Sequence, residues 1–124
     1  MHRVVDAMNV IGSRPDGWWR DRPAAILRLV GALDSWADAQ EERVTVVLER
    51  EPAEPLATEH VELVWAPAAG RDAADDEIAR RLPGWLAEGD EVVVVTSDRA
   101  LAERARAAGA AVEGAAGFRR ALDP

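Results

Sequence analysis

The sequence predicts an α/β fold in which an open, mostly parallel β-sheet carries helices on both faces. Two observations support this prediction. Short β-branched runs alternate along the chain with segments of helical periodicity, which is typical of β-α-β units with right-handed crossovers. In addition, residues 43–49 and 91–96 are too continuously apolar in their centres to leave one face in water, which indicates buried parallel strands.

The strands are the apolar runs bounded by turn-forming residues. The run at 60–65 alternates apolar and polar positions, which predicts an edge strand with one wet face. The run at 91–96 is the most apolar and is expected to be the most buried. In chain order, the expected strands are residues 3–6, 43–49, 60–65, 91–96 and 110–112.

The helices are recognised by their periodicity and by their ends. Pro23 suits the first turn of a helix, Asp72 is an expected N-cap and Gly109 is an expected C-cap. Pro83 and Gly84 should break or kink the helix in which they fall. The expected helices are residues 23–40, 73–82 and 99–108, with a last helical turn at 118–122. The first of them has an apolar stripe made of Ile26, Leu27, Leu29, Val30, Leu33, Trp36 and Ala37.

Length and composition limit the class of protein. The chain of 124 residues is the size of one ordinary domain, so we expect a single domain over residues 1–124. No run approaches the roughly 20 apolar residues of a membrane span, and we expect a cytoplasmic protein without membrane contacts. The absence of cysteine excludes thiolate metal ligands and a cysteine nucleophile. The net charge of −8 disfavours nonspecific coating of nucleic acid but permits a nuclease whose acids surround metal ions.

Carboxylates follow the predicted strands at one edge of the sheet. Asp6 ends the first strand, and Asp98 follows the fourth, where it also suits the N-cap of a helix. In open α/β sheets, functional groups gather beyond the carboxyl ends of the strands. Asp75 shares a helix face with apolar residues, whereas Asp76 lies about 100° round the helix and nearer the surface. If the first and fourth strands are neighbours, these acids meet at one edge.

Acids that meet in this way favour a bound cation. Clustered carboxylates repel one another, and a divalent cation relieves the repulsion. Oxygen ligands without cysteine or clustered histidine favour Mg²⁺ or Mn²⁺ over Zn²⁺. Such an ion suits phosphodiester hydrolysis because it activates a water and stabilises the charge of the transition state. A plainer interpretation stays open, in which each acid is a helix cap or a hydrogen-bonded structural group.

Three short motifs carry a resemblance to a known family. They are the segments DAMNVIG at 6–12, ADDEI at 74–78 and TSD at 96–98. In order, they resemble the Asp-Gly-x-Asn opening, the Ala-Asp-Asp-x-Ile helix start and the third acidic motif of NYN domains, particularly the bacterial YacP-like branch of the PIN-like nuclease superfamily. The resemblance covers nearly the whole chain.

The resemblance implies a three-layer αβα PIN-like fold with strand order 3-2-1-4-5, and metal-dependent, usually endonucleolytic, cleavage of RNA. It implies that Asn9 orients an acid or a phosphate and belongs to the catalytic set. The other members of that set are the implied ligands of Mg²⁺ or Mn²⁺, namely Asp6, Asp75, Asp76 and Asp98. One departure is Ala7, where the family commonly has glycine; alanine would hinder a backbone that needs a positive φ or the close approach of a phosphate.

Aromatic and basic residues near the expected site are candidate RNA contacts. Trp18 and Trp19 adjoin several arginines, so a tryptophan could stack on single-stranded bases while guanidinium groups hold phosphates. We expect one of the pair, Trp18, to contact the substrate. The full set of expected substrate contacts is Ser13, Arg14, Trp18, Arg20, Arg71, Ser97 and Arg99.

The sequence therefore predicts a Mg²⁺- or Mn²⁺-dependent ribonuclease whose partner is RNA, single-stranded rather than duplex. Two alternatives stay open. One is an RNA-binding module of the same fold, associated with the ribosome or the RNA-processing machinery, that has kept the acids but lost turnover. The other is a small-ligand or regulatory α/β domain in which the acids serve only as helix caps.

Overall fold

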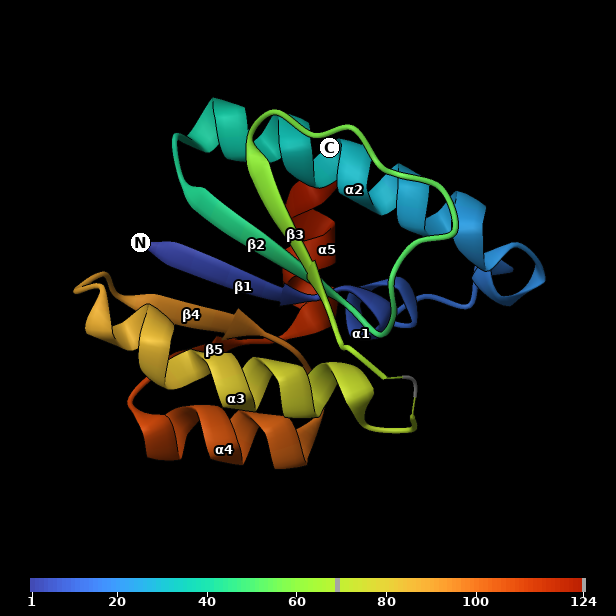
Figure 1. Cartoon of the computed structure of the whole chain (residues 1–124). Helices are drawn as coiled ribbons and strands as arrows, with labels where there is room; N and C mark the ends of the chain where they lie inside the picture. The colour runs from blue at the N-terminus through green and yellow to red at the C-terminus, as the bar shows by residue number, and fades with distance from the viewer. Residues whose placement is uncertain (69, 124) are drawn as a thin grey trace.

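The computed structural model describes residues 1–68 and 70–123, which form a five-stranded sheet between two layers of helices (Figure 1). The strands are β1 (His2–Asp6), β2 (Arg43–Leu48), β3 (Val61–Trp65), β4 (Val92–Val95) and β5 (Ala111–Glu113). Every neighbouring pair among them is parallel, and the order is β3-β2-β1-β4-β5. This order confirms the predicted topology, including the adjacency of the first and fourth strands.

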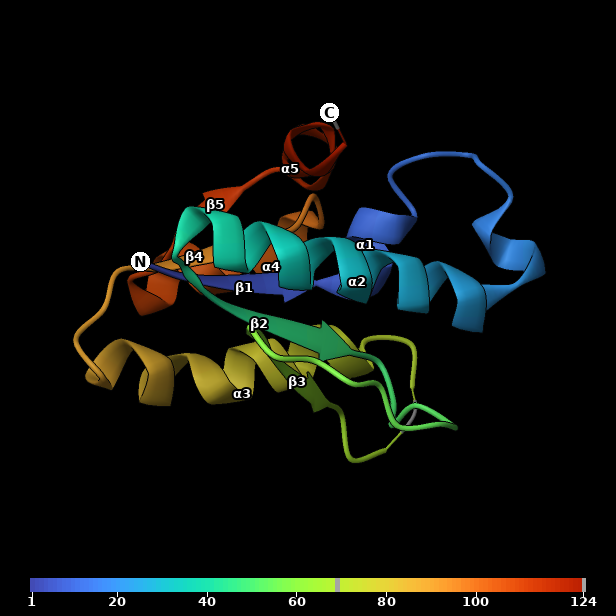
Figure 2. The same ribbon diagram turned by 90° about the horizontal axis from the view of Figure 1, so that it is seen from above.

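Helices cover both faces of the sheet. They are α1 (Ala7–Ile11), α2 (Arg22–Gln40), α3 (Ala73–Ala87), α4 (Arg99–Ala108) and α5 (Ala115–Leu122), with a single 3₁₀ turn η1 (Trp18–Arg20). In Figures 1 and 2, α2 and α5 lie on one face of the sheet, and α3 and α4 lie on the other. The short helix α1 follows β1 directly and packs beside α2 and α5. Within the described residues, no helix is both long enough and apolar enough to cross a membrane.

Each face of the sheet has its own apolar core. Alternate residues of β1 divide between the two: Val5 packs with residues of α2 and α5, whereas Val4 packs with residues of α3 and α4. β4 is buried on both faces, which explains its uninterrupted run of valines. β3 is an edge strand with half-buried and exposed positions, as its alternating sequence predicted. By the same alternation along β1, the side chain of Asp6 falls on the face covered by α3.

The predicted end of this helix at residue 82 was wrong: Pro83 and Gly84, expected to break or kink it, do not break it, and α3 continues to Ala87. Pro83 lacks the N–H group that would bond to the preceding turn, but it lies on the exposed side of the helix. Beyond it, Trp85 is buried in the core and meets the ring of His2 edge-on, with the ring centroids 5.6 Å apart. This packing keeps the last turn helical despite the missing hydrogen bond.

Three smaller predictions also need correction. Leu27 lies outside the buried stripe of α2, with 59% of its surface exposed. The last helix begins at Ala115 rather than at residue 118, because Ala115 is itself buried and Gly114 supplies an extended N-cap backbone. Asp72 occupies the N-cap position of α3, but its side chain makes no capping hydrogen bond. Its φ of −111° and ψ of 26° depart from the extended backbone that usually directs an N-cap side chain to the first turn.

Candidate active site

Asp6 is the last residue of β1 and is buried at the carboxyl edge of the sheet, with 4% of its surface exposed. β1 and β4 run in register with Val5 opposite Val95, so the residue that follows Val95 lies next to Asp6. That residue is Thr96, whose hydroxyl donates to Asp6 Oδ2 at 3.2 Å. Two segments separated by 90 residues thus meet at one carboxyl group.

The second carboxyl group at this point belongs to Asp75, in the first turn of α3. Burial raises the pKa of Asp6 from 3.8 to about 7, and the charge of Asp75 adds to the effect, whereas the hydroxyl of Thr96 and the backbone amide of Asn9 oppose it. The two carboxyl groups lie close enough to affect each other's pKa, and burial raises the pKa of both. This pair is the centre of the candidate site.

Asp98 lies close enough to Asp75 for its negative charge to raise the pKa of Asp75. Burial is the largest cause that raises the pKa of Asp75, and the charge of Asp98 is the next. As predicted, Asp98 caps α4, since its Oδ1 accepts from the backbone N–H of Leu101 at 2.8 Å. Its own backbone N–H donates to Thr96 Oγ1 at 3.1 Å, which fixes it relative to Asp6. The structure therefore brings Asp6, Asp75 and Asp98 to one edge, where β1 and β4 end.

Asp76 takes a different direction from its neighbour Asp75. Asp75 is half-buried, whereas the side chain of Asp76 is 68% exposed, in agreement with their predicted places around the helix. Asp76 accepts from Arg104 of α4 at 2.9 Å. Its charge still contributes to the raised pKa of Asp75. Direct metal ligation by Asp76 stays a prediction, and the contact that the structure shows for it is this ion pair.

Asn9 connects α1 to the loop that follows β4. Its side-chain oxygen accepts from the backbone N–H of Ser97 at 2.7 Å. In turn, Ser97 Oγ accepts from the backbone N–H of Ala115, at the start of α5, at 2.9 Å. The backbone amide of Asn9 lies beside the carboxyl group of Asp6 and favours its ionised form. Asn9 therefore acts on the acidic pair from one side and on the loop that carries Asp98 from the other.

Ala7 occupies the position at which the family commonly has glycine. It is the first residue of α1 and is completely buried. Among the described residues, the one non-glycine residue with a positive φ is Glu41, far from the site. Position 7 thus has a right-handed helical backbone that alanine adopts freely, and the freedom of glycine is not needed there.

The donors at this edge fit Mg²⁺ or Mn²⁺ in kind, because they are carboxylate oxygens that repel one another. The positions of these oxygens in the described residues do not form a complete metal site. Within residues 1–68 and 70–123, no three Asp, Glu or His side chains surround one point closely enough to hold a metal ion. Asp98 Oδ1 is engaged by the first turn of α4, and Asp6 Oδ2 accepts from the hydroxyl of Thr96. A metal site at this edge therefore requires side-chain rotation, and it stays a prediction.

Four of the expected substrate contacts are engaged within the protein, and Ser97 is one of them through its bonds with Asn9 and Ala115. The hydroxyl of Ser13 donates to a carbonyl of α1 at 2.7 Å, and Arg14 forms an ion pair with Asp123. Trp18 is half-buried and packs against the core that includes residues of α2. The guanidinium of Arg22 lies 5.3 Å from the centroid of the Trp18 ring. These contacts give each residue a structural role, and RNA contact by them stays a prediction.

The remaining arginines of the expected set are open to solvent. Arg20, Arg71 and Arg99 are exposed, and none of them forms an ion pair with another described residue. Trp19, next to Arg20, has 51% of its surface exposed and meets Trp18 edge-on with ring centroids 5.9 Å apart. The better placed of the two tryptophans for a base is therefore Trp19, and Trp18 is the one that supports it.

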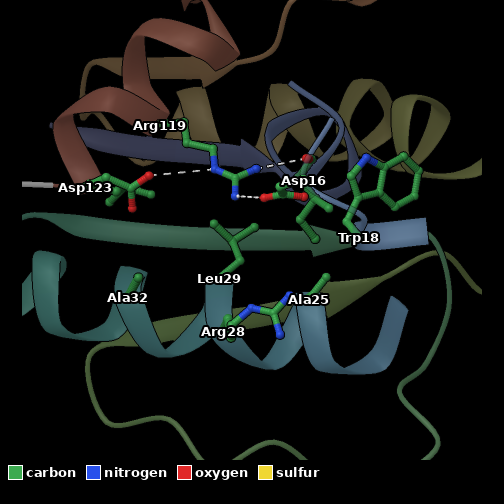
Figure 3. Close-up of a pocket in the computed structure, with 10 residues that line it drawn as sticks. Asp16, Trp18, Ala25, Arg28, Leu29, Ala32, Arg119 and Asp123 are labelled. Carbon is green, nitrogen blue, oxygen red and sulfur yellow. Dashed lines mark hydrogen bonds and ion pairs between the residues drawn. The ribbon is translucent and has the colours of Figure 1, made fainter. Parts of the chain in front are cut away.

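A separate hollow of about 150 Å³ lies between α2 and α5 (Figure 3). Leu29 and Trp18 provide apolar walls, and the rim carries the charged side chains of Asp16, Arg28 and Arg119. None of the predicted carboxylate ligands lines it. It is on the face of α2 and α5, whereas the acidic pair is on the face of α3, so the hollow is not part of the candidate site.

The fold and the site together define a class of protein, the PIN-like α/β domains, in which acids gather where the central parallel strands end. More narrowly, the chain belongs to the YacP-like NYN domain family, whose model matches residues 3–124. This confirms the family that the sequence resembles and places the chain in a nuclease-like family.

Solved structures agree with this assignment. The crystal structure of a tryptophan-to-leucine mutant of Rae1 (YacP) from Bacillus subtilis matches with a TM-score of 0.79 and 21% identity, over 99% of this chain and 74% of that one. The crystal structure of Rae1 (YacP) without that mutation matches with the same TM-score and coverage at 19% identity. None of the curated proteins compared with the chain matches it. At these identities, the structural likeness establishes the shared fold.

Proposed function

We propose that this domain is a Mg²⁺- or Mn²⁺-dependent endoribonuclease that hydrolyses phosphodiester bonds of single-stranded RNA. The observation that carries the proposal is the pair formed by buried Asp6 and half-buried Asp75, in which the pKa of Asp6 is raised to about 7. Carboxyl groups with strongly shifted pKa values are typical of functional sites. This pair lies at the carboxyl ends of central parallel strands, in a member of a nuclease-like family.

The residues that would hold the ion are Asp6 and Asp75, with Asp98 as a third ligand, directly or through water, and Asp76 as an assisting acid. When bound, the ion supplies an activated water and stabilises negative charge on the phosphate in the transition state. Asp6 would release its proton as the ion binds, because a neighbouring cation favours the carboxylate. The cation would relieve the unfavourable proximity of the two carboxyl groups, which adds to burial in raising the pKa of Asp6.

The other residues of the site would orient the RNA. With its oxygen held by Ser97, Asn9 has its side-chain NH₂ group left to donate to a phosphate oxygen. The exposed guanidinium groups of Arg20, Arg71 and Arg99 would hold further phosphates of the strand.

The test is cleavage of a panel of labelled single-stranded RNAs with Mn²⁺ or Mg²⁺ in excess and after chelation. The wild-type domain should cleave internally when the metal is present, and Asp6→Asn should abolish cleavage because the amide cannot provide the anionic ligand. Asp90→Asn, which changes an exposed acid elsewhere on the surface, is the matched control and should cleave normally. Metal-independent cleavage, or cleavage that survives Asp6→Asn, contradicts the proposal.

A second candidate function has one observation in its favour. The three acids do not surround a common point in the described part of the chain, and Asp98 already has a structural partner. A domain of this kind could bind RNA, on the ribosome or in an RNA-processing assembly, without turnover. This candidate predicts that the wild-type domain retards RNA in a binding assay, that it leaves every RNA of the panel intact, and that added Mn²⁺ does not raise its Tm.

A further inference from the structure

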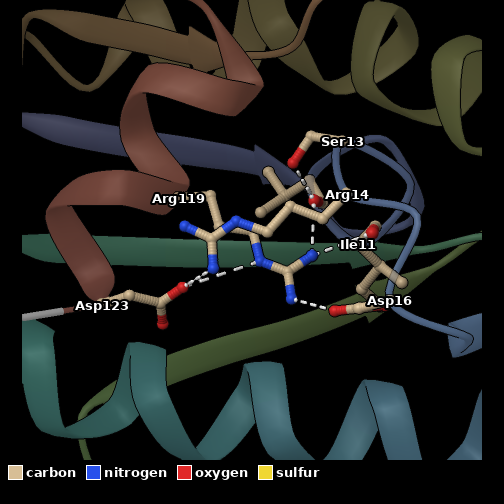
Figure 4. Close-up of polar contacts among 7 residues, drawn as sticks. Ile11, Ser13, Arg14, Asp16, Arg119 and Asp123 are labelled. Carbon is tan, nitrogen blue, oxygen red and sulfur yellow. Dashed lines mark hydrogen bonds and ion pairs between the residues drawn. The ribbon is translucent and has the colours of Figure 1, made fainter.

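Arg119 on α5 makes polar contacts with the helix that carries Asn9 (Figure 4). Its Nη1 donates to the backbone carbonyl oxygen of Ile11 at 2.9 Å and to that of Val10 at 3.3 Å. Its Nη2 donates to Asp16 at 2.8 Å, in the loop that follows α1. The side chain is 19% exposed, so these bonds form in a partly desolvated place where they are stronger than on an open surface.

The helix that Arg119 contacts cannot be stable alone. α1 has five residues, and so short a helix fixes several backbone dihedrals for very few internal hydrogen bonds. The last carbonyl groups of any helix lack partners inside it. Arg119 supplies such partners to α1, and a positive charge is also favourable at the carboxyl end of a helix. These bonds tie the carboxyl end of α1 to a side chain from more than 100 residues further along the chain.

Helix α5 also contacts Ser97, the residue that donates a hydrogen bond to Asn9. At the start of α5, the backbone N–H of Ala115 donates to Ser97 Oγ at 2.9 Å, and the backbone N–H of Ser97 donates to Asn9 Oδ1 at 2.7 Å. One end of α5 therefore fixes the loop after β4, while Arg119, one turn further, fixes α1. The hydrogen bond between Asn9 and Ser97 joins two segments that α5 holds separately.

We propose that Arg119 is a positioning residue of the active site: it holds α1 so that Asn9 keeps its place between the Asp6–Asp75 pair and the loop of Asp98. This inference rests on the proposed nuclease function, but its geometric part can be tested without it. The guanidinium is suited to the task because its planar fork reaches two carbonyl groups and a carboxylate at once. Arg119 touches no part of the acidic pair, so it acts through α1.

The test compares Arg119→Met with Arg120→Met and Arg119→Lys. Methionine keeps the length of the side chain but removes every donor, and Arg120 is an exposed neighbour on the same helix, so its substitution is a matched control. Two quantities are measured: the NMR signals of the Asn9 side-chain amide together with hydrogen exchange at the Ser97 amide, and kcat and KM for single-stranded RNA with Mn²⁺.

In Arg119→Met, the Asn9 signals should shift and exchange at Ser97 should become at least about tenfold faster, because the bond between them is no longer held. Cleavage should lose at least about tenfold in kcat with KM little changed, as expected for misplaced site groups. Arg119→Lys should recover part of both effects, and Arg120→Met should match the wild type. A lower Tm without change in the Asn9–Ser97 signals or in kcat overturns the proposal. If the wild type cleaves no RNA, the nuclease function fails, and the NMR arm still decides whether Arg119 positions Asn9.

Discussion

Thr96 donates its hydroxyl hydrogen to Asp6 across 3.2 Å, and this bond joins the end of β4 to the end of β1. The same hydroxyl oxygen accepts from the backbone N–H of Asp98 at 3.1 Å. Thr96 is almost fully buried, so no solvent replaces either bond if it is lost. The hydroxyl therefore sets how Asp6 and Asp98 face each other, although it is not itself an acid or a metal ligand.

Replacing Thr96 by valine should destabilise the domain by about 1–3 kcal/mol, because a buried carboxyl group and a buried amide lose their partner. Since the Thr96 hydroxyl lowers the pKa of Asp6, the same change should raise that pKa further and weaken Mn²⁺ binding near neutral pH. Urea denaturation and a Mn²⁺ titration measure the two effects. Thr96→Ser, which keeps the hydroxyl, should stay close to the wild type in metal binding; equal losses in both variants would show that the methyl group matters rather than the hydrogen bond.

Asp6 should make the metal-free domain less stable as the pH rises from about 4 to about 7. Its pKa is about 7 when folded against an ordinary value of 3.8, so the folded state holds the proton in a range where the unfolded chain has lost it. The difference of about 3 pH units corresponds to at most about 4 kcal/mol. Asp6→Asn removes this penalty, so its Tm should exceed that of the wild type at pH 8 and approach it at pH 4.

Added metal should reverse the order of the Tm values of the wild type and Asp6→Asn at pH 8. Mn²⁺ or Mg²⁺ binds the ionised pair in the folded state alone, so it should raise the Tm of the wild type at pH 8 and leave Asp6→Asn unchanged. Differential scanning calorimetry at several pH values, with and without metal, measures both parts. A wild-type Tm that is independent of pH between 4 and 8 contradicts the raised pKa of Asp6, and a Tm that does not respond to metal contradicts the ion site.

The sequence predicted the sheet and the acidic edge because both depend on regular patterns. Parallel strands with buried faces read as apolar runs, and their carboxyl ends share one edge, so Asp6 and Asp98 could be placed without coordinates. The role of Thr96 was within reach as well: it directly follows the strand paired with β1, opposite the position of Asp6. The sequence pattern does not show how the side chain of Asp98 is oriented. That orientation decides whether Asp98 acts as a helix cap or as a metal ligand.

Exposed Trp19 should contribute to RNA binding more than half-buried Trp18. Base stacking on an aromatic ring contributes about 1–3 kcal/mol per base, so Trp19→Ala should weaken binding of a single-stranded oligonucleotide about 5- to 150-fold. Fluorescence anisotropy in the Asp6→Asn background measures affinity without cleavage. Leu27→Ala, which removes another exposed apolar side chain near the start of α2, is the matched control and should bind normally. Unchanged affinity in Trp19→Ala contradicts the stacking role.

The periodicity of the sequence could not show which of the two tryptophans faces the core, or that Arg119 contacts α1. Trp18 and Trp19 lie in a 3₁₀ turn reached through a loop, which extends outward from α1 in Figure 2, and no repeat tells which ring faces the core. α1 is too short to show a helical period, so its place beside α5 was not predicted. The contacts of Arg119 with α1 join positions 108 and 109 residues apart, and they depend on packing that only the folded chain creates.

The last prediction separates the two roles of Asp98. Asparagine caps helices about as well as aspartate, so Asp98→Asn should keep the bond to the Leu101 amide and change stability little. Asp98→Ala removes the cap and should cost about 1 kcal/mol or somewhat more. If Asp98 also binds the ion, both variants should lose Mn²⁺ affinity and RNA cleavage to a similar extent, because neither has the negative charge. If Asp98 is a cap alone, Asp98→Asn should bind metal and cleave RNA like the wild type. Any loss of activity in Asp98→Ala should then parallel the loss of stability that urea denaturation measures.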